Sequence, residues 1–224
     1  MPSVLAVFGG RQALAHEVKP RMSDDERLIG RAAADDRAAF RELYNRHRAD
    51  VARLVYRMLG GRGDLEDVIQ EVFVQVHRSL KDFRGQSKFS TWLHRVTVNV
   101  VLMHRRAARS RPVFADEPLG EALAPGDDVR PDEDAERRER VRAFARLLDR
   151  LADKKRVVFV LHELEGITPS EIAKIVGAPV LTVRTRLFYA RREIEAMLGD
   201  EPSLASLQNR FSKASGDGGE SEEP

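Results

Sequence analysis

Cysteine is absent from the 224 residues of the sequence, and its absence excludes several kinds of site at once. A chain without thiols has no disulfide framework, no thiol nucleophile and no zinc finger, and its composition suits a reducing cytoplasm. Long apolar runs are missing too, since no stretch approaches the 18 or more residues of a membrane span. The short apolar run near the start follows no positive charge and ends at Gly9, Gly10 and Arg11, so we expect no signal peptide. We therefore expect a cytoplasmic protein.

Proline is missing from Ser23 to Arg111, and aromatic residues make up only 6% of the chain. Because proline disrupts helix interiors, its absence over this stretch predicts a compact all-helical domain. Apolar residues recur there every three or four positions, and the same period returns near residue 132. We expect Ser23 and Asp64 to cap helices, and the glycines after Leu59 to end one. The predicted helices cover residues 25–34, 37–59, 64–80, 89–108, 132–151 and 153–164.

The net charge of +2 conceals a strong separation of charge along the chain. Residues 112–136 carry nine acids and one base, and residues 200–224 carry six acids and two bases. The remaining residues therefore have a net charge of +14. The first acidic stretch also contains four prolines, so we expect a flexible acidic linker there and a disordered acidic tail from Asp200. The basic folded parts indicate a polyanionic partner.

The stretch from Gly166 to Arg192 predicts two short helices joined by a tight turn. Pro169 suits the first turn of a helix, Gly177 ends it, and a longer helix starts at Val180. On this second helix, 3.6-residue spacing turns apolar residues to one side and leaves the other side exposed and basic. That arrangement is typical of a DNA-reading helix-turn-helix, although an ordinary helical hairpin with a solvated basic face has the same pattern. The exposed arc comprises Leu181, Thr185, Phe188, Tyr189 and Arg192, flanked by Arg184, Arg186 and Arg191.

Two further surfaces are predicted in the proline-free half of the chain. Asp67, Gln70 and Glu71 fall together on the outer face of their helix, where a solvated face is the simplest interpretation. A polar loop from Arg84 to Lys88 then leads into the next helix. That helix is predicted to turn Phe89, Trp92, Leu93, Val96, Val100 and Met103 inward and to carry Arg95, Asn99 and Arg106 on the neighbouring stripe. Cations beside aromatic rings, with an amide in reach of base edges, indicate single-strand binding, although Trp92 could equally be a core residue.

Three motifs, in order along the chain, point to one known family. They are DLEDVIQEVF from Asp64, FRGQSKFSTWL from Phe83 with Asn99 after it, and VVFVLHELEGIT from Val157 with TVRTRL from Thr182. From about Ser23 to Leu198 the chain resembles an extracytoplasmic-function (ECF) sigma factor of the sigma-70 family. The resemblance implies an all-α protein with two small helical domains, a sigma region 2 bundle and a sigma region 4 helix-turn-helix, joined by the flexible acidic linker. The implied division is an N-terminal arm over residues 1–22, which we expect to be disordered, region 2 over 23–111, the linker over 112–131, region 4 over 132–199 and an acidic disordered tail over 200–224.

The resemblance also implies partners and a role for each surface. Asp67, Gln70 and Glu71 would dock on the beta-prime clamp of core RNA polymerase, with the beta flap as a second polymerase contact. The minus-ten promoter element would be captured as unstacked bases by Arg84, Lys88, Thr91, Trp92, Arg95 and Asn99. The minus-thirty-five element would be read as duplex by Arg184, Thr185, Phe188 and Tyr189, with Arg191 and Arg192 near phosphates. An anti-sigma factor, often membrane-anchored in this family, would occlude the same surfaces.

Two other classes of function compete with promoter recognition. A two-domain regulator could sense a ligand with its first domain and bind an operator with its second, but such a sensor has no reason to carry the loop and helix of Phe83–Leu93. An enzyme is disfavoured because the six histidines have no metal-ligand or triad spacing and no glycine-rich phosphate loop occurs. We therefore expect no catalysis, no cofactor, no metal and no small-molecule substrate.

Overall fold

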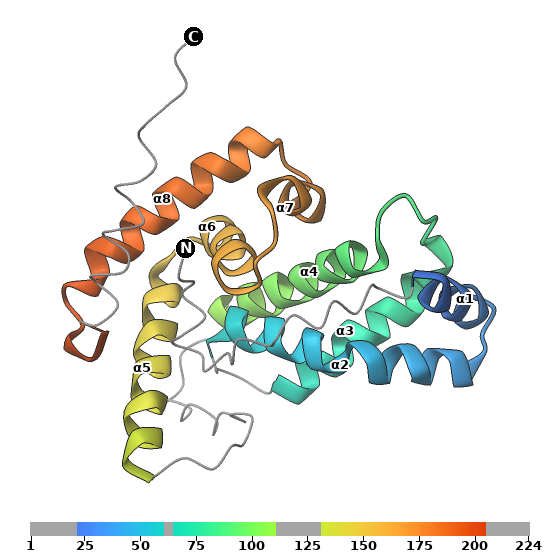
Figure 1. Ribbon diagram of the computed structural model, residues 1–224, viewed down its shortest axis with the longest axis horizontal. Helices are drawn as coiled ribbons and strands as arrows, with labels where there is room; N and C mark the ends of the chain where they lie inside the picture. The colour runs from blue at the N-terminus through green and yellow to red at the C-terminus, as the bar shows by residue number, and fades with distance from the viewer. Residues whose placement is uncertain (1–21, 61–64, 111–130, 205–224) are drawn as a thin grey trace. The chain divides into compact units, whose positions relative to one another are not determined.

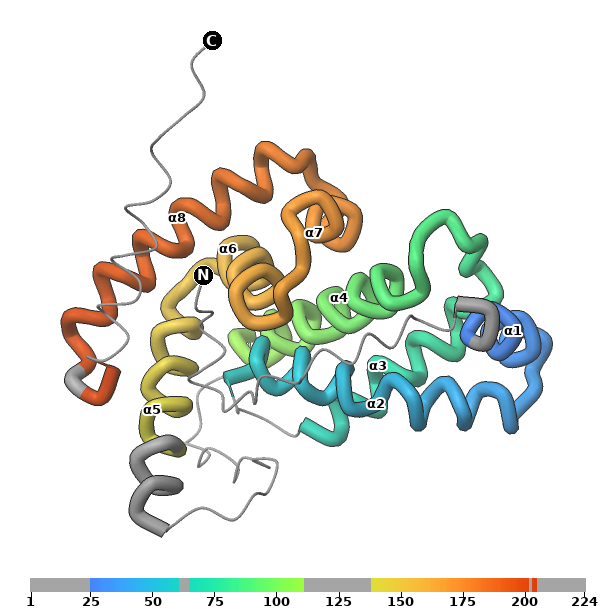
Figure 2. The backbone as a smooth tube through the Cα atoms, in the orientation of Figure 1, coloured from blue at the N-terminus to red at the C-terminus, as the bar shows by residue number. Residues whose placement is uncertain are grey.

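The computed structural model describes residues 22–60, 65–110 and 131–204. Within these ranges the ordered elements are all helical and no strand occurs (Figure 1, Figure 2). They form two compact units, one N-terminal and one C-terminal, each with its own core. The prediction of an all-α fold is confirmed. The predicted N-terminal arm, the acidic linker, the Asp64 cap and nearly all of the tail lie outside the described residues.

The N-terminal unit is a helical bundle with an aliphatic centre. It contains α1 (Met22–Ala33), α2 (Arg37–Leu59), α3 (Leu65–Ser79), the 3-10 helix η2 (Leu80–Asp82) and α4 (Phe89–Ser110). The helices α2, α3 and α4 pack on one another, and α1 packs against α2 and η2 (Figure 1). Fully buried side chains at the centre are Leu54, Val55 and Met58 from α2, Val72 from α3 and Val101 from α4. Each contributes about 1.5–3 kcal/mol through its burial, so this core fixes the surfaces that the helices present.

The two ends of α2 are set by the residues that flank it. The Asp36 carboxylate accepts hydrogen bonds from the backbone N–H groups of Ala38 at 2.9 Å and Ala39 at 3.1 Å. The Ala39 hydrogen bond, followed by one from Arg31, lowers the pKa of Asp36. At the other end Gly60 has a φ of 68°, a left-handed conformation that favours glycine, and it closes the helix. The predicted start and end of this helix are confirmed.

Two predictions for the N-terminal unit are wrong. The first helix begins at Met22 and not at Asp25, so Ser23 lies within the helix instead of capping it. No residue between these positions opposes a helical turn, and the helical hydrogen bonding therefore starts earlier. Met103, which the helical period turns inward, is 62% exposed. No residue of α4 after Val101 is buried, so the last turns of the helix extend past the core and leave Met103 accessible.

His47 lies on α2 with its imidazole largely enclosed. Its Nε2 atom is 3.6 Å from a carboxylate oxygen of Asp25, and its ring meets the Phe89 ring edge-on with 5.1 Å between the centroids. Burial lowers the pKa of His47 below the usual histidine value, because desolvation outweighs the attraction of Asp25 and Asp50. The imidazole is therefore neutral at pH 7.

The N-terminal unit is expected to lose stability as the pH falls below about 6.5, the pKa of histidine in an unfolded chain. Below about pH 6.5 the unfolded chain binds a proton at His47 that the folded unit does not bind, so the free energy of unfolding decreases. Above about pH 6.5 the contribution of the neutral His47 to stability is fully present. Denaturant titrations followed by the fluorescence of Trp92, the single tryptophan, measure this effect. In the His47→Phe variant the free energy of unfolding should depend less on pH. If it changes with pH as steeply as in the wild type, His47 is not the group responsible.

The C-terminal unit is built from helices of different lengths. Its elements are α5 (Pro131–Arg150), α6 (Asp153–Phe159), the π-helical segment η3 (Val160–Leu164), α7 (Pro169–Val176), α8 (Val180–Leu198) and the 3-10 helix η4 (Pro202–Leu204). The helix α8 packs against α6 and α5. Gly177, with a φ of 63°, ends α7 and gives the corner of the predicted helix-turn-helix. The helix predicted over residues 153–164 instead changes its winding after Phe159, where the Glu165 N–H bonds to the Val160 carbonyl oxygen at 3.1 Å.

A buried ion pair joins α5 to α6. The guanidinium of Arg156 is fully buried, and its Nη1 atom lies 2.6 Å from Oδ1 of Asp149. Moving two charges out of water is costly, and their attraction offsets that cost only while both are present. The C-terminal core therefore depends on this pair remaining intact.

Ordered structure continues past Asp200, where the disordered tail is predicted to begin. Leu204 is fully buried, and η4 packs against α5. The Arg146 guanidinium also lies 3.4 Å from the Glu201 carboxylate. The packing of Leu204 against α5 explains why the first residues of this otherwise polar segment are ordered. In the part of the chain that the structure describes, no helix has both the length and the apolarity needed to cross a bilayer.

Candidate nucleic-acid and protein interfaces

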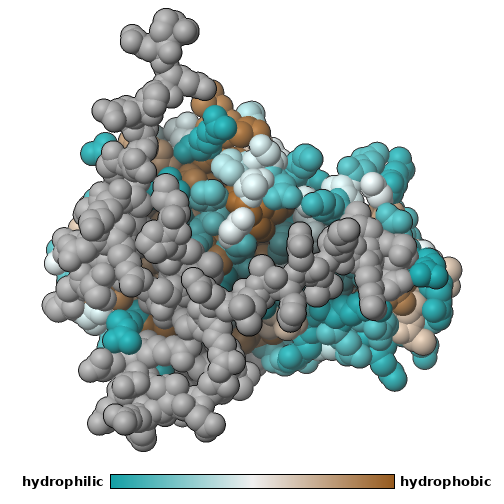
Figure 3. Space-filling view, in the orientation of Figure 1, coloured by the Kyte–Doolittle hydropathy of each residue, from teal (hydrophilic) through white to brown (hydrophobic). Residues whose placement is uncertain are grey.

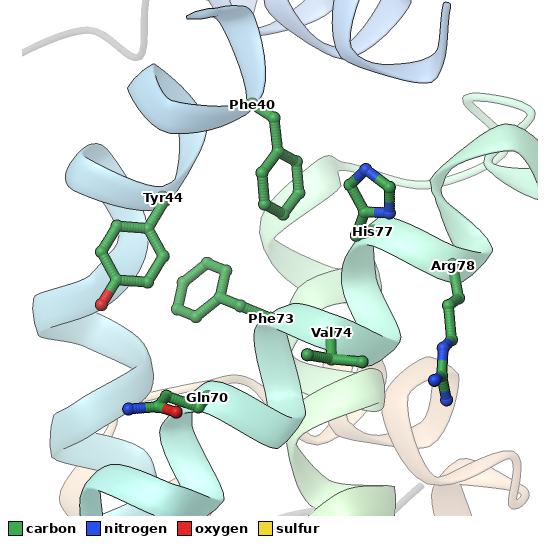
Figure 4. Close-up of a pocket in the computed structure, with 7 residues that line it drawn as sticks. All are labelled: Phe40, Tyr44, Gln70, Phe73, Val74, His77 and Arg78. Carbon is green, nitrogen blue, oxygen red and sulfur yellow. The ribbon is translucent and has the colours of Figure 1, made fainter. Parts of the chain in front are cut away.

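The outer face of α3 carries the three residues predicted to dock on polymerase. Asp67, Gln70 and Glu71 are all exposed and neighbour one another on the helix. Gln70 borders a shallow depression of about 450 Å³ between α2 and α3 (Figure 4). An acidic face beside an apolar depression differs from a merely solvated helix face, because the apolar groups gain free energy when a partner covers them.

The depression is lined mainly by aromatic and aliphatic side chains. The lining residues are Phe40 and Tyr44 of α2 and Gln70, Phe73, Val74, His77 and Arg78 of α3. The rings of Tyr44 and Phe73 lie 4.6 Å apart, those of Phe40 and His77 lie 4.9 Å apart, and Val74 is 47% exposed (Figure 4). Sequence reasoning missed this depression. It exists only where two helices meet, so no local pattern along one helix indicates it.

The loop between η2 and α4 rests on a triangle of aromatic rings. The ring centroids of Phe83, Phe89 and Trp92 are separated by 5.4 to 5.7 Å. Phe89 is buried, whereas Trp92, which the helical period turns inward, is only half-buried. Gly85 has a φ of 68°, and this left-handed conformation lets the loop turn sharply. The aromatic triangle therefore supports both ends of a basic loop whose residues remain accessible.

The polar residues of this loop and of α4 form an exposed surface next to Trp92. Lys88, Thr91, Arg95 and Asn99 follow one another at intervals of three or four residues, which places them on one stripe. Thr91 is half-buried, and the other three are exposed together with Arg84 in the loop. Further along α4, Arg106 is exposed, whereas Arg105 donates a hydrogen bond to the Met58 carbonyl oxygen at 3.4 Å. The stripe offers cations and an amide beside a partly accessible aromatic ring.

The exposed face of α8 has the composition that the sequence predicts. Its exposed residues include Arg184, Thr185, Phe188, Tyr189 and Arg192, whereas Val183, Leu187, Ala190 and Ile194 are buried on the opposite side. Phe188 and Tyr189 meet edge-on at 5.4 Å. The Arg192 guanidinium lies 5.8 Å from the Phe188 centroid, and the Lys155 ammonium lies 5.9 Å from the Tyr189 centroid. These cation–π contacts restrain both rings while leaving about half of each side chain accessible.

Arg191 is engaged within the protein. Its Nε and Nη2 atoms lie 2.7 Å and 2.6 Å from Oε1 of Glu163, in the π-helical segment. This half-buried ion pair connects α8 to η3 and helps to fix the orientation of α8 within its unit. The role of Arg191 near phosphates stays a prediction. No local sequence pattern indicates its pairing with Glu163, because the two residues are 28 positions apart.

Comparison with known proteins assigns both halves of the chain. The family model described as Sigma-70 region 2 matches residues 43–111, and the one described as Sigma-70, region 4 matches residues 142–194. The ECF RNA polymerase sigma-E factor of Haemophilus influenzae is 35% identical over 179 residues, which cover 76% of this chain and 93% of that protein. The chain is an ECF sigma factor of the sigma-70 family.

Other relatives of this sigma factor agree with that assignment. The ECF RNA polymerase sigma-E factor of Escherichia coli K12 is 36% identical over 177 residues, covering 76% of this chain and 92% of that protein. The RNA polymerase sigma-H factor of Pseudomonas aeruginosa is 32% identical over 180 residues, covering 78% and 93%. Among solved structures, CnrH in complex with the cytosolic domain of CnrY is 27% identical with a TM-score of 0.58, covering 80% of this chain and 99% of that one. The resemblance inferred from the three motifs is confirmed.

Among the described residues of this sigma factor, no three His, Asp or Glu side chains are grouped as ligands of a metal ion.

Proposed function

We propose that this sigma factor binds core RNA polymerase, recognises and opens promoters for it, and performs no chemistry of its own. The observation that carries the proposal is that one chain contains sigma region 2 followed by sigma region 4. Each region also has an exposed surface with the chemistry for nucleic acid or protein binding. A ligand-sensing operator regulator has no use for region 2, so we set that alternative aside. The site of action that follows from the proposal is the cytoplasm, where polymerase and DNA are.

We assign polymerase docking to the outer face of α3. Asp67 and Glu71 supply negative charge, Gln70 supplies an amide, and Val74 lies beside them at the apolar depression. An apolar centre with a polar rim is the usual anatomy of a protein interface. We assign this face to the beta-prime clamp, and we assign the C-terminal unit to the beta flap.

We assign the capture of single-stranded minus-ten bases to the loop and α4. The assigned residues are Arg84, Lys88, Thr91, Trp92, Arg95 and Asn99. Opening a duplex costs about 1.4 kcal/mol per base-pair step on average, and stacking a base on an aromatic ring returns about 1–3 kcal/mol. The half-buried Trp92 supplies a partly accessible aromatic ring, and the neighbouring cations release counterions from the DNA backbone. The surface therefore offsets part of the cost of opening the minus-ten element.

We assign duplex reading of the minus-thirty-five element to α8, through Arg184, Thr185, Phe188 and Tyr189, with Arg191 and Arg192 near phosphates. Arg184 is exposed in the second turn of the helix and forms no ion pair with the other described residues. Its guanidinium is therefore available to donate two hydrogen bonds to a guanine, the commonest specific contact in the major groove.

Arg184→Ala is expected to weaken promoter binding by about 1–3 kcal/mol and to relax the preference at one minus-thirty-five base. Arg184 lies on the DNA-reading face of α8 and not on the α3 face assigned to the beta-prime clamp, so affinity for core polymerase should stay unchanged. Competition binding of the holoenzyme to promoters substituted one base at a time measures the loss of promoter affinity and the change in base preference. An equal loss on every promoter sequence would assign Arg184 to a phosphate instead.

We also propose that a protein antagonist binds this sigma factor. The similarity to CnrH, which was solved with the cytosolic domain of CnrY, supports a partner of that kind for this chain. We infer a membrane-anchored anti-sigma factor that covers the docking and DNA-reading surfaces.

Reconstitution with core RNA polymerase tests the proposed function directly. The full chain should co-elute with core polymerase and direct transcription from a defined set of promoters when start sites are mapped genome-wide. Specific binding to an operator without co-elution would support the regulator alternative instead.

A further inference from the structure

The most exposed large hydrophobic side chain in the described part of the chain is Leu181, with 74% of its surface accessible. It is the second residue of α8, in the turn that a recognition helix presents to base edges. Figure 3 shows hydrophobic surface over this end of α8, beside α7. A single exposed leucine needs no explanation, but this one has apolar neighbours along the same face.

Leu181, Thr185 and Phe188 occupy positions i, i+4 and i+7, so they form one stripe along the exposed face of α8. The Thr185 hydroxyl donates its proton to the Leu181 carbonyl oxygen at 3.0 Å. That proton is therefore used within the helix, and the methyl group of Thr185 remains for outside contacts. Phe188 is 55% exposed and is restrained by Tyr189 and Arg192. The stripe thus presents three apolar groups, and the Phe188 ring among them is held by its neighbours.

The charge around the stripe identifies the kind of partner that covers it. Residues 180–192 contain four arginines and no acidic residue, and the first carboxylate of α8 is that of Glu193. Such a surface favours a polyanion and repels a basic protein face. DNA is the polyanion that a helix-turn-helix fits.

Duplex DNA presents one apolar group to a helix in its major groove, the 5-methyl group of thymine. We propose that Leu181 and Phe188 read thymine methyl groups in the minus-thirty-five element, which makes Leu181 a specificity residue in addition to the residues assigned above. The inference rests on the proposed function of α8. The two side chains are seven residues apart, about 10 Å along the helix, so the thymines that they contact lie within about three base-pair steps of each other.

The test removes methyl groups from the DNA one at a time. The minus-thirty-five sequence preferred by the reconstituted holoenzyme is first selected from random sequence, and each thymine in it is then replaced by deoxyuridine, which lacks only the methyl group. For the wild-type chain we expect a loss of affinity of about fourfold at each contacted thymine, the fold-change that corresponds to about 0.8 kcal/mol for one buried methyl group. Deoxyuridine in the spacer between the two promoter elements is the matched control and should change nothing.

The Leu181→Ala variant identifies the residue that reads each methyl group. At the position that Leu181 contacts, the variant should bind promoters with thymine and with deoxyuridine equally well. At the position that Phe188 contacts, it should still prefer thymine. Because Leu181 is exposed, the variant should fold normally. An equal loss on thymine and deoxyuridine promoters would overturn the proposal, as would a wild-type holoenzyme that is insensitive to every methyl group.

Two other outcomes are distinguishable from these. Weaker assembly of the Leu181→Ala variant with core polymerase would assign the leucine to a protein contact. That result would overturn the reading of thymine methyl groups by Leu181 and leave the proposed function in place. A wild-type chain that neither co-elutes with polymerase nor selects any minus-thirty-five sequence would overturn the proposed function as well.

Discussion

Reversing one charge on α3, in the Asp67→Lys variant, is expected to lower the affinity for core RNA polymerase at least about 100-fold and to abolish co-elution. Asp67 is exposed and lies one turn from Glu71 and near Gln70, which borders the apolar depression. A lysine there would face a surface that attracts acids, and like charges brought together at an interface cost several kcal/mol. About 2.8 kcal/mol already corresponds to 100-fold. Fluorescence anisotropy with labelled core polymerase, in the absence of DNA, measures the effect on docking alone.

Glu26→Lys is the matched control for this experiment. Glu26 is an exposed acid on α1 of the same unit, so its replacement changes the net charge of the chain by the same amount. This variant should dock and transcribe as the wild type does. Both variants should unfold at the same denaturant concentration when Trp92 fluorescence is followed. An Asp67→Lys protein that still co-elutes and transcribes would show that the α3 face is not the docking site.

Removing one half of the buried ion pair, in the Asp149→Ala variant, is expected to lower the free energy of unfolding of the C-terminal unit by about 3–5 kcal/mol. Arg156 is fully buried, so its charge would lose the carboxylate 2.6 Å away without gaining water in exchange. A domain of this size has about 5–15 kcal/mol of stability in total, so a large share would be lost. Circular dichroism follows the helices of both units, whereas fluorescence follows only the N-terminal unit, which contains the single tryptophan. The circular dichroism transition should therefore shift while the fluorescence transition does not.

The double variant Asp149→Ala with Arg156→Met separates charge from packing. Methionine fills much of the volume of arginine without a charge, so the double variant should recover most of the lost stability. If it is as unstable as Asp149→Ala alone, lost packing and not the loss of the carboxylate charge explains the effect.

Features that depend on neighbouring residues along the chain were predictable from the sequence. The ends of α2 follow from Asp36 and Gly60, and the corner of the helix-turn-helix follows from Gly177, because capping and left-handed turns are local. The buried and exposed faces of α8 follow from the helical period, since this helix packs along its length.

Features that depend on where a helix meets its neighbours were not predictable. Met103 is exposed because α4 runs past the core, a fact about the lengths of the other helices and not about the period of α4. The pair of Arg191 with Glu163 and the depression beside Gln70 likewise require two elements to meet. Helical spacing indicated most of the site residues, the motifs supplied their roles, and the structure adds which of them have competing contacts.

The burial of Leu204 sets a boundary for experiments on the acidic tail. A shortened chain that ends at Gly199 would remove this leucine from its place on α5, together with the Glu201 partner of Arg146. Exposing that place forfeits about 1.5–3 kcal/mol of burial, and any resulting loss of transcription would be misread as a function of the tail. Truncation after Leu204 removes the remaining tail and leaves α5 covered, so it is the position from which the role of the acidic residues should be judged.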